Sequence, residues 1–201
     1  MNKAIASFFK FFLAVLLMPV AWASASQFHK HIVGFPKPYA EFFYWGMFGF
    51  VVLYIFFYQF WGPFELGQKI TGGIFQFTTP ANRFIANIIP FYLTVILLLY
   101  YVVLDFLEIK TFNHYFMFFS GFAFTMHILL VAQDLQDAEK AFIKPTYLMS
   151  IMFIVTLMIC VTVLLYDFVL QEFTFPEFIK LVVNEAWDIY ADAKGRVTFW
   201  K

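Results

Sequence analysis

The chain has 201 residues, of which 63% are hydrophobic, 24% aromatic and only 13% charged. This composition, with a mean hydropathy of +0.78, excludes an ordinary soluble domain and predicts a polytopic membrane protein. Thirteen basic residues balance thirteen acidic ones, so no basic field favours nucleic acid as a partner. A single cysteine excludes an internal disulfide and any cysteine-rich metal site.

Residues 1–23 have the features of a secretory signal peptide. A positively charged start precedes a short apolar stretch, and Ala21 and Ala23 occupy two small-residue positions just ahead of Ser24. We therefore predict cleavage before Ser24. A second interpretation is an uncleaved anchor, because residues 4–22 nearly reach the length of a membrane span.

Four longer apolar segments follow the predicted cleavage point. Each approaches the ~20 residues that an α-helix needs to cross a bilayer core ~30 Å thick. They predict an all-α domain of four transmembrane helices, with a bend at Pro90 in the second. The expected spans are residues 42–61, 84–104, 115–132 and 147–166, in a membrane domain over 42–168 that an external segment over 24–41 precedes.

The connector over residues 62–79 is more polar than the spans that it joins. It holds Glu65, Lys69 and a pair of glycines, with apolar residues among them. These features predict a short amphipathic or re-entrant piece at the membrane interface. Thr79 and Pro80 predict the start of the next helix, with the threonine as its N-cap.

The C-terminal part, residues 169–201, contrasts with the membrane domain. Thr174, followed three residues later by Glu177, forms a capping box, which marks a helix start. The spacing of the apolar residues predicts an amphipathic helix over about residues 175–192. We expect a protein partner, or else the lipid interface, to cover its apolar face. That face comprises Phe175, Phe178, Ile179, Val182, Val183, Ala186 and Tyr190.

The orientation in the membrane does not follow from lysine and arginine counts, because these residues are balanced between the two sides of the predicted spans. The signal peptide therefore decides it. We expect the N-terminal segment and the C-terminal helix on the outer side of a bacterial inner membrane, with two short loops in the cytoplasm.

His127 lies inside the third predicted span, five residues from its end. Ionisable residues are rare in hydrocarbon and usually face a protein interior. Together with Thr125 and Asp134 it forms a candidate intramembrane polar site, with Asp134 on the same face about 10 Å along the helix. We favour an interhelical hydrogen bond from a neutral imidazole. The alternative is a proton path, which Asp105 and Glu108 would also line.

Sequence motifs give no support for an enzyme. His114 and His127 are about 20 Å apart along a helix, so they cannot ligate one haem iron. No His-Glu-x-x-His site includes His127, and no serine lies in a Gly-x-Ser-x-Gly turn. We therefore predict no cofactor and no metal site.

Small and weakly polar residues mark the faces on which helices are expected to pack. In the third span, Gly121 and Thr125 have the small-xxx-small spacing that allows close approach, beside Ser120. In the fourth span, Thr156 and Cys160 form a similar stripe. We expect these faces to hold helices together rather than to line a substrate path.

These observations predict a non-enzymatic integral membrane subunit of a larger bacterial inner-membrane complex, in contact with lipids and with protein partners. A protein with four membrane spans and very little chain outside the membrane fits a subunit of a complex better than a protein that functions alone. The first alternative is a small transporter or proton-conducting component that uses His127 and nearby carboxylates. The second is a subunit that binds haem or quinone.

Overall fold

The computed structural model describes residues 3–57, 61–78, 81–107, 113–137, 145–170 and 173–198. Within these ranges every regular element is a helix, which confirms the predicted all-α class. In chain order the elements are α1 (Lys3–Val33), α2 (Tyr39–Phe57), α3 (Trp61–Ile74), the 3-10 helix η1 (Gln76–Thr78), α4 (Asn82–Ile88), α5 (Phe91–Leu107), α6 (Asn113–Asp137), α7 (Pro145–Leu170) and α8 (Phe175–Thr198).

Four of the described helices are long and apolar enough to cross a membrane, so the chain has the build of a multi-pass membrane protein. They are α1, α2, α6 and α7. The predicted set differs at one member, because α1 qualifies and the predicted second span does not. The apolar helix in that second position, Phe91–Val103, is shorter than a full span.

The predicted single span over residues 84–104 is wrong, because the chain is broken there into α4 and α5. α4 ends at Ile88, and Ile89 is extended, with φ −85° and ψ 112°. Pro90 explains the break, since proline lacks an N–H group and its ring disfavours helical geometry at the preceding residue. The expected bend is therefore a complete interruption of the helix.

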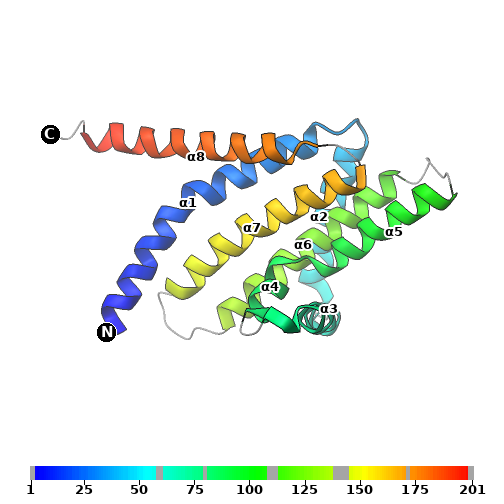
Figure 1. The fold of residues 1–201 in the computed structure, drawn as a ribbon, viewed down its shortest axis with the longest axis horizontal. Helices are drawn as coiled ribbons and strands as arrows, with labels where there is room; N and C mark the ends of the chain where they lie inside the picture. Colours follow the sequence, from blue (N-terminus) through cyan, green and yellow to red (C-terminus); the bar gives the residue numbers. More distant parts are fainter. Residues whose placement is uncertain are drawn as a thin grey trace.

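Five apolar helices alternate in direction, as Figure 1 shows: α1, α5 and α7 run one way, and α2 and α6 run the other. The bundle therefore has two ends. α3 and α4 lie at one end, and α8 begins at the other, where α7 finishes, and runs back beside the second half of α1. The connector between the first two predicted spans forms α3, which is seen nearly end-on in this view.

α1 continues beyond the predicted signal peptide, and α8 continues beyond residue 192. α1 is one helix of 31 residues that contains Pro19 and continues through Ser24, so the predicted external segment is the end of α1 and the start of α2. Cleavage before Ser24 stays a prediction. α8 begins at Phe175, as expected, and ends at Thr198.

α2 and α6 approach each other closely at a contact that depends on two glycines. A Cβ atom on Gly121 would lie 2.0 Å from the carbonyl oxygen of Phe43, and one on Gly46 would lie 1.9 Å from that of Phe118. The two backbones therefore touch, which only glycine permits at these positions. This contact holds α6, and with it His127, in a fixed position within the bundle.

Candidate functional site at the break between α4 and α5

The break at Pro90 changes the bonding of the backbone just before it. In a continuous helix, the carbonyl of Asn87 would accept a hydrogen bond from the N–H of residue 91. Here it pairs with Nε2 of His127 on α6, at 2.9 Å. A carbonyl can only accept, so Nε2 is the donor and carries the proton. His127 thus bonds the backbone at the helix interruption.

His127 is held in a closed environment. It is 5% exposed, and its ring packs in a T-shaped arrangement with that of Phe64 from α3, with centroids 5.9 Å apart. The predicted interhelical hydrogen bond from this histidine is therefore present. Its acceptor is a main-chain carbonyl rather than another side chain.

Asn87 extends the polar contacts from α6 to α3. Its side chain is 3% exposed, and its Oδ1 accepts a hydrogen bond of 2.7 Å from Nε2 of Gln68. The three residues His127, Asn87 and Gln68 therefore form a polar row across α6, α4 and α3. Two of them are fully buried, and Gln68 is at the edge of a cleft.

The cleft lies among α3, α4 and α6 and has a volume of about 460 Å³. Glu65 and Lys69 on its wall form an ion pair of 3.8 Å with both side chains well exposed. Asp134 from α6 also lines it, so this predicted site residue faces the same region as the polar row. The lining residues are Glu65, Gln68, Lys69, Gly72, Asn82, Ala86 and Asp134.

Besides His127 and Asp134, only Thr125 of the residues predicted for the polar site or the proton path has a described side chain. The hydroxyl of Thr125 donates to the carbonyl of Gly121 in its own helix, at 2.9 Å. Glu108 and the side chain of Asp105 lie outside the described part of the chain. No group of three His, Cys, Asp or Glu side chains that could hold a metal ion occurs among the described residues. Among the described side chains, the charged groups near the polar row are Glu65, Lys69 and Asp134, which line the cleft.

The residues predicted to pack helices all lie at helix contacts or bond within their own helix. Gly121 is at the crossing with α2, and Ser120 is fully buried beside Tyr166 of α7. The hydroxyl of Thr156 donates to the carbonyl of Met152, at 2.8 Å. Cys160 is half-buried against the main apolar core.

Most of the apolar face of α8 is packed against the chain itself. Phe178, Val182 and Ala186 are 4–5% exposed, and Phe175, Ile179 and Tyr190 are partly buried against the same core. Val183 is the exception, with 59% of its surface exposed. Whether a partner protein binds this helix stays a prediction, but the covered residues are not free to be its binding surface.

The first turn of α8 is held by a residue from the end of α7. Asp167 is 7% exposed, and its carboxylate accepts a hydrogen bond of 2.6 Å from the N–H of Phe175 and one of 2.5 Å from the hydroxyl of Thr174. A carboxylate at a helix N-terminus satisfies free N–H groups and complements the helix dipole. Asp167 therefore caps the N-terminus of α8, a role that the sequence pattern had assigned to Thr174.

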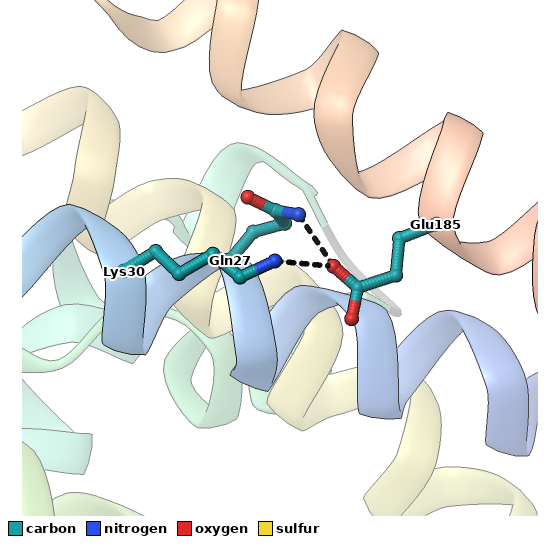
Figure 2. A network of polar contacts seen from close by, with 3 residues as sticks. All are labelled: Gln27, Lys30 and Glu185. Atoms are coloured by element: carbon teal, nitrogen blue, oxygen red, sulfur yellow. Dashed lines mark hydrogen bonds and ion pairs between the residues drawn. The ribbon is translucent and has the colours of Figure 1, made fainter.

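The middle of α8 is joined to α1 by a small polar network, drawn in Figure 2. The carboxylate of Glu185 accepts hydrogen bonds from Gln27 and from Lys30, the latter at 3.2 Å. Partial burial raises the pKa of Glu185, but the hydrogen bonds from Ser26, Lys30 and Gln27 and the charge of Lys30 outweigh it. The net pKa lies below its ordinary value of 4.5.

Sequence reasoning missed Asn87, Gln68 and Gly46, which all act through partners on other helices. Asn87 carried one usable signal, because it lies three residues before Pro90, where carbonyl groups lose their helical donors.

No protein-family model matches the chain, and no curated protein or solved structure matches it.

Proposed function

We propose that this protein is a non-enzymatic, multi-pass subunit of a larger complex in a bacterial inner membrane. Its bundle anchors α8 at the outer face, where α8 contacts a partner protein. α3 and α4 then lie at the cytoplasmic end, because they are at the opposite end of the bundle in Figure 1.

The use of polar side chains inside the bundle supports a structural role. His127 donates to the main-chain carbonyl of Asn87. The hydroxyls of Thr125, Thr156 and Thr162 each donate to the carbonyl four residues earlier in their own helix. These bonds satisfy polar groups in an apolar medium. They leave little side-chain chemistry for turnover of a substrate.

The exposed side of α8 is the observation on which the proposal rests. Leu181, Val183 and Trp187 of α8 are 43%, 59% and 72% exposed. Burial of a large apolar side chain contributes ~1.5 to 3 kcal/mol. A second protein that covers these side chains would therefore gain substantial affinity from a small contact.

The test is purification from the native membrane in mild detergent, with quantitative mass spectrometry of the proteins recovered. We expect one partner at a constant ratio to the chain. Val183→Lys should remove the partner and leave the chain stable, because Val183 does not belong to the core. Asn184→Lys is the matched control, since it adds the same charge at the next, exposed position of α8.

Two results would overturn this proposal. One is the absence of any protein at a constant ratio to the wild-type chain. The other is a partner that Val183→Lys and Asn184→Lys retain equally. Val182→Lys is unsuitable for the test, because Val182 is 5% exposed and a lysine there would disrupt the fold of the chain itself.

A second candidate function, a proton-conducting component, is favoured by the polar row. His127, Asn87 and Gln68 lead from the bundle interior to the cleft that Asp134 and Glu65 line. Proteoliposomes with an internal pH-sensitive dye would test it. His127→Gln keeps an N–H donor for the Asn87 carbonyl but cannot titrate. Proton flux that disappears in this variant would favour conduction over the structural role.

A further inference from the structure

α1 passes through the predicted cleavage point without interruption. Ala23 and Ser24, on either side of that peptide bond, both have no exposed surface. The hydroxyl of Ser24 donates to the carbonyl of Val20, at 2.8 Å, and so bonds across the position that would be cut. Tolerance of a chain to cleavage depends on the burial and hydrogen bonding of the backbone concerned. In the folded protein this bond is protected on both counts.

The residues before this bond are part of the bundle. Ala14 and Ala21 are 5% and 8% exposed, and small residues at such positions allow helices to pack closely. Nearer the start of α1, Nζ of Lys10 donates to the hydroxyl of Thr146 in the first turn of α7, at 3.1 Å. α1 and α7 start at the same end of the molecule in Figure 1 and run in the same direction. The N-terminal helix is therefore bonded to α7 at the start of both helices.

α8 contacts α1 on both sides of the predicted cleavage point. Before it, the hydroxyl of Tyr190 donates to the carbonyl of Leu16. Leu16 lies three residues before Pro19, within α1. After it, Gln27 and Lys30 bond Glu185 (Figure 2). Loss of residues 1–23 would leave Tyr190 and Thr146 without these partners.

From these contacts we propose that α1 is retained in the mature protein as a membrane helix, and that α8 is the intramolecular clamp that holds it. The N-terminus then stays in the cytoplasm, and α8 lies on the opposite side of the membrane. This inference does not rest on the proposed function, because a retained α1 is compatible with a subunit and with a proton-conducting component alike.

The first test determines the N-terminus of the wild-type chain. The protein is expressed with a C-terminal tag in a Gram-negative host, together with a periplasmic protein that has a cleavable signal peptide. We expect the full mass of 23.7 kDa plus the tag, with residue 1 or 2 at the N-terminus, while the control protein is processed. A chain that begins at Ser24 would overturn the proposal.

The second test examines the clamp and uses a photoreactive benzoylphenylalanine at position 190. On irradiation in the membrane we expect it to attach to residues around Leu16, as mapped by peptide mass spectrometry. The same amino acid at position 187 is the control, because Trp187 is 72% exposed. Attachment to α1 that is no greater from position 190 than from position 187 would show that α8 does not hold α1.

Discussion

Gly121→Ala should destabilise the protein through one contact, the crossing of α6 with α2. The new Cβ would lie 2.0 Å from the Phe43 carbonyl oxygen, whereas ordinary contacts are about 3.5 Å, so the helices must separate by roughly 1.5 Å. Overpacking of this kind lowers the free energy of unfolding by about 3 kcal/mol when backbone atoms must move. The higher helix propensity of alanine relative to glycine restores about 1 kcal/mol. The net loss of about 2 kcal/mol corresponds to a fall in Tm of about 4–8 °C.

The assay is thermal unfolding in detergent. Unfolding is monitored by the reaction of a thiol-specific fluorophore with Cys160, the only cysteine. Gly49→Ala is the control, because its Cβ would lie 3.4 Å from the tip of the Phe118 ring, an ordinary contact. That variant should keep its Tm or gain slightly. If Gly121→Ala unfolds at the same temperature as Gly49→Ala, the α2–α6 contact is not as close as described, and the argument fails.

Three further predictions concern polar groups. Asp167→Ala removes the cap of α8 and should cost about 1–2 kcal/mol, seen as faster hydrogen exchange of the Phe175 amide, whereas unchanged exchange would rule out the cap. Glu185 has a lowered pKa, so its contribution is present above pH 4.5 and is lost as the pH falls through the lower, folded-state value. Its pair with the exposed Lys30 is worth about 0–1 kcal/mol, and Glu185→Gln should remove that part of the pH dependence of Tm. His127→Leu leaves its carbonyl partner unpaired and should cost about 1–3 kcal/mol, whereas His127→Gln should cost less; equal values of Tm would contradict the hydrogen bond.

Local patterns in the sequence predicted the elements that depend on neighbouring residues. The apolar runs identified α2, α6 and α7, and the capping box located the start of α8 at Phe175. The interruption at Pro90 was foreseen only as a bend. Whether a proline bends or breaks a helix depends on which groups nearby accept or donate to the freed backbone, and here that group is His127 from another helix.

The missed residues are those whose role is fixed by distant parts of the chain. Gly46 has no small residue four positions away, so its own segment does not reveal a packing face. Its role, which is to allow close approach of α2 and α6, becomes clear only when α6 is known to be the neighbouring helix. Likewise, Gln68 and Asn87 lie in what the sequence presents as a connector and an apolar span. Their hydrogen bond joins helices whose contact no spacing rule predicts.

Two buried polar side chains of the described structure bond backbone groups at helix ends. His127 bonds the Asn87 carbonyl beside Pro90, and Asp167 bonds the first N–H of α8. In an apolar medium each such backbone group would otherwise cost several kcal/mol. These helix ends therefore explain why polar residues are tolerated in these positions.

The same pairing limits what His127 can do. Its Nε2 proton is directed at a carbonyl, which cannot accept a proton, so transfer along the row towards Gln68 would require the imidazole to turn away from Asn87. That rotation leaves a buried carbonyl unpaired and costs about 1–3 kcal/mol. A conducting histidine would have to break this bond in each cycle, whereas a structural histidine keeps it. This hydrogen bond thus favours a structural role of His127 over a role in proton transfer, and the His127→Gln variant separates the two.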